Sequence, residues 1–81
     1  MKNILVLGAV GQIGSELVPY LRNIYGDQAV VALDYCPNFP QEILEGGPCI
    51  TMDAMDATAL FDVVKKYKID TILNLVAVLS A

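Results

Sequence analysis

Three glycines and one carboxylate in the first 34 residues have the types and spacing needed to bind phosphate and ribose groups. Gly8 can adopt the backbone angles of a sharp turn. Gly11 leaves no side chain between the backbone and a phosphate, and Gly14 allows a helix to approach a strand closely. Asp34 follows Gly14 by 20 residues, the separation expected for an acid that binds a ribose. The chemistry predicted from these residues is dinucleotide binding.

The elements expected around these residues are those that such a site requires. Two apolar runs, Asn3–Leu7 and Ala29–Leu33, are predicted to be buried strands, and the second ends at Asp34. A helix between them, over roughly Gln12–Tyr25, would direct its free N–H groups and positive dipole end at the phosphates. A purely structural turn is the alternative interpretation of the glycines. No Lys or Arg lies near Asp34, so its carboxylate would repel a 2′-phosphate, which favours NAD over NADP.

The helix over residues 12–25 is expected to bury one apolar face. Its apolar residues recur at steps of three and four, and they are Ile13, Leu17, Leu21 and Ile24. Arg22 is expected on the opposite side of the helix. Pro19 removes a backbone donor and is expected to kink it.

The second half of the chain is predicted to repeat the strand–helix–strand order. A short strand over Cys49–Met52 precedes a helix over roughly Ala57–Tyr67, for which Asp56 is the expected N-cap. The buried face of this helix is expected to contain Leu60, Val63, Val64 and Tyr67. The long apolar run Thr71–Val78 is typical of a strand in a parallel sheet, because helices cover both faces of such sheets.

These elements predict an α/β fold with a Rossmann-like parallel sheet. Right-handed crossovers would give the strand order 3-2-1-4 with helices on both faces. Residues 1–81 contain no apparent domain boundary and are predicted to be the N-terminal part of an NAD-binding domain. The chain is 56% hydrophobic and only 17% charged, which is unusually apolar for its length and indicates that other protein covers part of it. The covering protein is either further C-terminal sequence or a partner chain.

The connector over residues 35–48 has two interpretations. Gln41–Glu45 is expected to form one helical turn within it. Tyr35 or Phe39 could stack on the adenine of a bound dinucleotide. The alternative is a connector that carries only a small apolar anchor.

Further candidate ligand-binding residues follow the third and fourth strands, where ligands bind in open parallel sheets. Asp53 could accept a hydrogen bond from an adenine amino group while the N–H of Ala54 contacts a ring nitrogen. Alternatively, Asp53 caps the next helix. Leu75 and Ala77 would let a cofactor pass close to the backbone, and the alternative interpretation of Leu75 is a plain core residue. Ser80 could face a substrate.

The composition argues against several other classes of function. The net charge is −4 and the five basic residues form no stripe, so nucleic-acid binding is not expected. No apolar stretch resembles a signal peptide or is long enough to span a bilayer, so we expect a cytoplasmic protein without membrane contact. Two cysteines, Cys36 and Cys49, and no histidine make no metal or redox motif.

The motif Gly8-x-x-Gly11-x-x-Gly14 resembles that of the extended and atypical short-chain dehydrogenase/reductase superfamily. Within it, the chain is most similar to the short-chain type of L-threonine 3-dehydrogenase, and the similar segments are Gly11–Leu17, Asp34, Met52–Asp56 and Leu75–Ala81. The resemblance covers essentially the whole chain. It implies oxidation of a small-molecule substrate, the amino acid L-threonine, to 2-amino-3-ketobutyrate with NAD as the cofactor. We expect the complete protein to be a homodimer.

The resemblance also implies a role for each matching residue. Its implied cofactor-binding residues are Gly8, Gly11, Gln12, Ile13 and Gly14 on the pyrophosphate, Asp34 on the ribose, Asp53 and Ala54 on the adenine, and Leu75 and Ala77 along the cofactor. Ser80 is implied to lie near the substrate.

The catalytic pair of the superfamily, Tyr-x-x-x-Lys, is absent from these residues. In that pair the lysine lowers the pKa of the tyrosine, which then acts as a general base. None of the four tyrosines is followed by a lysine four residues later, so no catalytic residue is assigned and the chain alone is expected to be inactive. We interpret the chain as the NAD-binding portion of an oxidoreductase. The alternatives are a stand-alone nucleotide-binding module or the same half-domain of a nucleotide-sugar epimerase or dehydratase.

Overall fold

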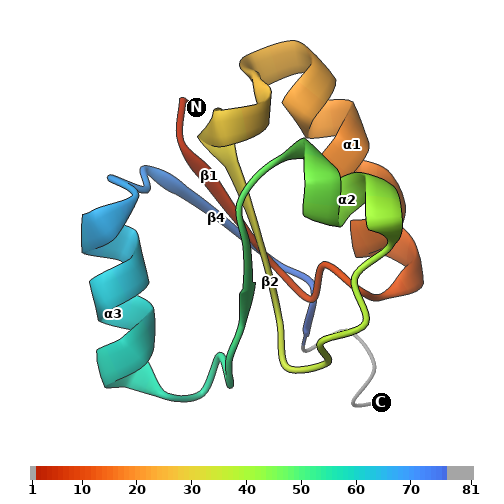
Figure 1. Cartoon of the computed structure of the whole chain (residues 1–81). Coiled ribbons are helices and arrows are strands. Elements are labelled where there is room, and N and C mark those ends of the chain that lie inside the picture. Colours follow the sequence, from red (N-terminus) through yellow and green to blue (C-terminus); the bar gives the residue numbers. More distant parts are fainter. Residues whose placement is uncertain (1, 77–81) are drawn as a thin grey trace.

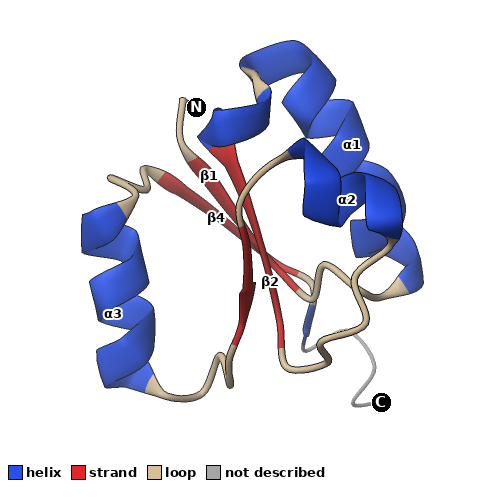
Figure 2. Cartoon of the chain, in the orientation of Figure 1, coloured by secondary structure: helices blue, strands red, loops and turns tan. Residues whose placement is uncertain are grey.

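The computed structural model describes residues 2–76, in which four parallel strands form one sheet between two layers of helices (Figures 1 and 2). The strands are β1 (Ile4–Leu7), β2 (Val30–Asp34), β3 (Cys49–Thr51) and β4 (Thr71–Asn74). The helices are α1 (Gln12–Tyr25), the short 3-10 helix η1 (Asp27–Ala29), α2 (Gln41–Gly46) and α3 (Ala57–Lys66). The spatial order β3-β2-β1-β4 confirms the predicted topology.

The two central strands are buried on both faces because their apolar side chains alternate between two cores. Ile4 and Val6 pack under α1 and α2, whereas Leu5 and Leu7 pack under α3. Figure 1 shows the same arrangement, with α1 and α2 on one side of the sheet and α3 on the other. A continuous apolar run is therefore required in β1 and β2, as expected for parallel strands with helices on both faces.

The predicted buried face of α1 is confirmed at Leu17 and Leu21, which pack in the first core, and is wrong at its two isoleucines. The helix begins and ends at the predicted residues and continues through Pro19. Ile13 and Ile24 are 58% and 53% exposed, and Arg22 is only 5% exposed. The buried residues of α1 are Gly14, Val18, Leu21 and Arg22. The buried face is thus rotated around the helix axis relative to the stripe defined by the apolar residues.

The burial of Arg22 has a clear physical cause, which is a set of three backbone carbonyls. Its guanidinium donates from Nε to the carbonyl oxygen of Val30 (3.2 Å), from Nη1 to that of Ile43 (2.7 Å) and from Nη2 to that of Pro48 (2.8 Å). A buried guanidinium is tolerated when its donors are satisfied in this way. Arg22 therefore ties α1 to the start of β2, to α2 and to the segment that enters β3.

The predictions for the second half of the chain agree well with the structure. Asp56 caps α3, because its Oδ1 accepts a hydrogen bond from the N–H of Ala59 (3.2 Å). The predicted face of α3 packs on the second core. The predicted turn at Gln41–Glu45 is the helix α2. The fourth strand was expected to reach Val78 but ends at Asn74, and residues 77–81 lie outside the described part.

Candidate functional site

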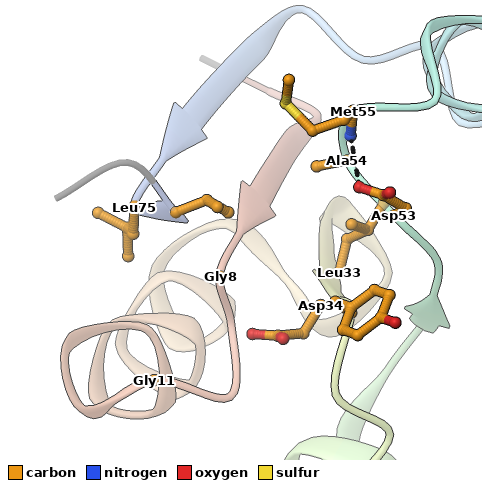
Figure 3. Close-up of a pocket in the computed structure, with 10 residues that line it drawn as sticks. Gly8, Gly11, Leu33, Asp34, Asp53, Ala54, Met55 and Leu75 are labelled. Atoms are coloured by element: carbon orange, nitrogen blue, oxygen red, sulfur yellow. Dashed lines mark hydrogen bonds between the residues drawn. The ribbon is translucent and has the colours of Figure 1, made fainter. Parts of the chain in front are cut away.

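A cleft of about 240 Å³ opens at the carboxyl ends of the strands (Figure 3). The residues that line it are Gly8, Gly11, Leu33, Asp34, Tyr35, Asp53, Ala54, Met55, Leu75 and Val76. Six predicted site residues are thereby brought together, namely Gly8, Gly11, Asp34, Asp53, Ala54 and Leu75. Three others, Gln12, Ile13 and Gly14, form the first turn of α1 next to Gly11. Ala77 and Ser80 lie outside the described residues.

The turn between β1 and α1 requires two of its glycines for the fold itself. Gly8 has a φ of 88°, and a Cβ on it would lie 3.3 Å from the Cβ of Leu75. Such a positive φ strongly favours glycine. A Cβ on Gly14 would overlap the carbonyl oxygen of Gly8 and lie 2.7 Å from the Cα of Ala9. Gly14 therefore allows α1 to pack directly against the turn.

Gly11 has no comparable structural requirement. Its φ of −63° and ψ of 170° are open to other residues. A Cβ on Gly11 would meet nothing closer than the carbonyl oxygen of Gly8, at 3.4 Å, which is near an ordinary contact. Gly11 is exposed and lines the cleft. The space beside it is therefore open to a ligand, and a side chain would fill that space.

The N-terminus of α1 has the donors that a phosphate needs. Gly11 is the N-cap, and no side chain caps the helix, in contrast to α3, which Asp56 caps. The first N–H groups of a helix lack partners within the helix and carry its positive dipole end. An open approach at Gly11 and an uncapped helix N-terminus together fit the pyrophosphate of a dinucleotide.

Asp34 lies at the end of β2 with both carboxylate oxygens held by backbone groups. Its Oδ2 accepts from the N–H of Val10 and its Oδ1 from the N–H of Cys36, both at 2.9 Å. A carboxylate oxygen accepts more than one hydrogen bond, so acceptor capacity remains for ribose hydroxyls. The described residues that line the cleft include no Lys or Arg that would pair with a 2′-phosphate. The arrangement fits NAD better than NADP.

Asp53 forms a local turn after β3 and does not cap α3, which rules out the alternative considered for it. Its Oδ1 accepts a hydrogen bond from the N–H of Met55 (2.9 Å). The side chain is exposed and lines the cleft beside Ala54, as Figure 3 shows. Its proposed contact with adenine remains a prediction.

Sequence reasoning missed one prominent residue of the cleft, Met55, whose side chain Figure 3 shows beside Ala54. The signal that could have identified it is its position two residues after Asp53, where an Asx turn brings the i+2 backbone toward the carboxylate.

Among the described residues, no group of three or more His, Cys, Asp or Glu could hold a metal ion. No helix within residues 2–76 is long and apolar enough to cross a membrane.

The comparisons with known proteins define the class of this chain. The sequence profile of the NAD dependent epimerase/dehydratase family matches residues 4–81. The chain belongs to this family, and the predicted cofactor, NAD, is thereby confirmed.

Individual relatives narrow the similarity further. An uncharacterized epimerase/dehydratase of Staphylococcus epidermidis is 40% identical over all 81 residues, which cover 26% of its length. The structure of L-threonine dehydrogenase from Clostridium difficile is 44% identical, with a TM-score of 0.86 over 93% of this chain and 24% of that chain. An L-threonine dehydrogenase from Cupriavidus necator is 35% identical, with a TM-score of 0.85 over 96% of this chain and 25% of that one. The chain thus spans about a quarter of the length of the relatives it matches.

Proposed function

We propose that this chain is the cofactor-binding part of an NAD-dependent L-threonine dehydrogenase. The observation that carries the proposal is the open cleft at Gly11, bounded by an uncapped helix N-terminus and the fixed carboxylate of Asp34. When bound, NAD supplies the acceptor for the hydride that an alcohol loses on oxidation. The residues of this chain bind and orient that acceptor.

Each cofactor-binding role that we propose follows the path of the dinucleotide across the sheet. The pyrophosphate lies at the turn formed by Gly8, Gly11, Gln12, Ile13 and Gly14. The adenosine ribose binds Asp34, and the adenine contacts Asp53 and Ala54. Leu75 and Ala77 lie along the cofactor toward the substrate, near which we place Ser80.

L-threonine is the proposed substrate because the similar solved structures described above are L-threonine dehydrogenases, at 44% and 35% identity. A second candidate is epimerisation or dehydration, a function favoured by the family description and by the name of the Staphylococcus epidermidis relative. The 81 residues contain no Tyr-x-x-x-Lys pair. We therefore propose that residues outside this segment carry the chemistry and that this segment alone is inactive.

We also propose that further polypeptide of the longer protein covers the β4 side of the sheet. Ile13 and Tyr20 are exposed on α1 next to Leu17. At about 100° per residue, both lie on the flank of α1 opposite Arg22. Arg22 faces α2 and the segment before β3, so the opposite flank faces β4. Ile72 of β4 is exposed as well, on the other face of the sheet, because it is paired with Leu5, which packs under α3. Exposed apolar side chains near β4 on both faces of the sheet favour coverage by more protein.

The experiment has two stages. Calorimetric titration of the full chain with NAD and with NADP tests cofactor binding, and we expect NAD to bind more tightly. The full-length protein is then assayed in two ways. NADH formation is measured with L-threonine as the substrate, and conversion of a nucleotide sugar is measured separately. Threonine-dependent NADH formation supports the proposal, and conversion of the nucleotide sugar alone would replace it with the second candidate.

A further inference from the structure

At the carboxyl ends of three of the four described strands, a side chain closes a short turn in the backbone. The side-chain oxygens of Asp34, Asp53 and Asn74 accept hydrogen bonds from the N–H groups two residues later, at 2.9, 2.9 and 3.0 Å. Such Asx turns hold the backbone as it leaves a strand. Asn74 differs from the two aspartates because it is uncharged and is not among the residues that line the cleft. Any effect of Asn74 on a ligand must therefore act through the backbone that it holds.

The backbone that Asn74 holds is the part of the chain after β4 that contacts the glycine turn. The N–H of Leu75 donates to the carbonyl oxygen of Leu7 at the end of β1 (2.9 Å). The next N–H, that of Val76, is the one that donates to Asn74. A Cβ on Gly8 would lie 3.3 Å from both the carbonyl carbon of Leu75 and the nitrogen of Val76. The peptide bond between these two residues therefore lies directly against Gly8, and Figure 3 shows Leu75 on the strand next to the one that leads into Gly8.

The glycine turn is thus held from both sides, because β1 lies between β2 and β4 in the sheet. On the β2 side, its N–H groups donate to the carbonyl of Leu33 and to the carboxylate of Asp34. On the β4 side, the contact is the close approach of the peptide bond that Asn74 holds. Asn74 is therefore the counterpart of Asp34 on the opposite side of the turn.

We propose that Asn74 is a positioning residue for the cofactor, because its side chain holds the backbone after β4 against Gly8 and so fixes the glycine turn in the form that receives the pyrophosphate. The proposal rests on the proposed cofactor-binding function. Without the side-chain acceptor, the N–H of Val76 would bond to water and the peptide bond before it could move away from Gly8. The hydrogen bond is exposed, so its loss is expected to affect ligand binding more than folding.

The test compares Asn74→Ala, Asn74→Ser and Asn74→Asp in the full chain by calorimetric titration with NAD. Asn74→Ala removes the acceptor and is expected to raise the Kd about three- to tenfold, which corresponds to the net contribution of one hydrogen bond. Asn74→Asp keeps an acceptor of the kind that Asp34 and Asp53 use, so its Kd is expected to stay within about twofold of the wild type, since an exposed charge is screened. A serine hydroxyl closes such turns more weakly, so Asn74→Ser is expected to have an intermediate Kd.

Asn3→Ala is the matched control because it removes the same atoms at the opposite end of the sheet. It also deletes an exposed hydrogen bond from a side chain to the backbone, which joins Nδ2 of Asn3 to the carbonyl oxygen of Lys68 (3.1 Å). Asn3→Ala and Asn74→Ala are expected to lower the urea midpoint by similar small amounts. Only Asn74→Ala is expected to lose affinity for NAD.

Each other outcome overturns a defined part of the reasoning. If the wild type binds NAD and Asn74→Ala binds it equally well, the positioning role is overturned while cofactor binding stands. Equal losses of affinity in Asn74→Ala and Asn74→Asp would assign the effect to the amide rather than to the turn, and equal losses in Asn74→Ala and Asn3→Ala would assign it to general stability; both results overturn the proposal. Absence of NAD binding by the wild type overturns the proposed function and this proposal with it.

Discussion

Replacing Gly11 and Gly14 separately by alanine distinguishes a glycine that serves the ligand from one that serves the fold. The added atom is the same in both variants, a single Cβ. At Gly14 that atom overlaps the carbonyl of Gly8, and at Gly11 its nearest neighbour is 3.4 Å away. We expect Gly14→Ala to lose stability, and we expect Gly11→Ala to stay folded and lose NAD.

The magnitudes follow from the same contacts. Alanine in an unobstructed helix is more stable than glycine by about 1 kcal/mol, but at Gly14 the backbone overlap forces α1 away from the turn. Overpacking of this kind costs about 1–3 kcal/mol. At Gly11, the entropic gain of alanine and its inferior N-capping oppose each other, which leaves a net change of about 0.5 kcal/mol or less. Displacing the pyrophosphate by a methyl group breaks at least one charge-assisted hydrogen bond, which raises the Kd for NAD by about 10- to 100-fold.

Urea denaturation followed by circular dichroism measures the first effect, and calorimetric titration with NAD measures the second. The expected result is a separation of the two variants, with stability lost in one and affinity lost in the other. Wild-type affinity in a folded Gly11→Ala variant would refute the reasoning, because the phosphates would then not approach the backbone at Gly11. A fully stable Gly14→Ala variant would refute the close packing of α1 on the turn.

Three further substitutions test other parts of the structure. Asp34→Asn is expected to raise the Kd for NAD about tenfold and to narrow the preference for NAD over NADP, because the charge that repels a 2′-phosphate is gone; titration with both cofactors measures this. Arg22→Met removes three charge-assisted hydrogen bonds, although the carbonyl of Pro48 keeps the N–H of Ala32 and that of Ile43 keeps the thiol of Cys49. Urea denaturation should therefore show a loss of about 2 kcal/mol or more, whereas a loss below about 1 kcal/mol would contradict the role given to the guanidinium. The hydrogen bond from Thr71, followed by those from the N–H groups of Lys2 and Asn3, lowers the pKa of Asp70 below 3.8. The folded state therefore binds fewer protons than the unfolded state, so the wild type should have a higher urea midpoint than Asp70→Asn at neutral pH. The difference between the two midpoints should vanish as the pH falls through the lowered pKa of Asp70.

The sheet topology and the glycine turn could be predicted because both depend on local rules. Continuous apolar runs specify strands buried on both faces, and right-handed crossovers then leave one order of strands. Asp56 could be assigned as a cap because an N-cap needs only a suitable side chain directly before a helix. Gly8 and Gly14 follow from backbone geometry and close approach, which are properties of the turn itself.

The buried face of α1 could not be predicted because it depends on partners distant in the sequence. The three carbonyls that bind Arg22 belong to residues 30, 43 and 48. No sequence pattern within the helix predicts these contacts. Hydrophobic periodicity ranks Arg22 as a surface residue and Ile13 as a core residue, and both assignments fail. The role of Asp53 was ambiguous because a carboxylate that precedes a helix can either close a turn or cap the helix. In the structure Asp56 is the cap of α3, and Asp53 closes the turn.

The position of Asp34 connects the separate parts of the cleft and gives the spacing of the motif a structural reason beyond the proposed ribose contact. One oxygen holds Val10 in the glycine turn, and the other holds Cys36 in the loop that carries Tyr35. The same carboxylate thus fixes the glycine turn and the loop after β2 relative to each other. An acid at the end of β2 can reach the glycine turn only because β2 is the immediate neighbour of β1 in the sheet. Because of these bonds, a substitution of Asp34 that removes either carboxylate oxygen is expected to alter the distance between the glycine turn and the loop after β2.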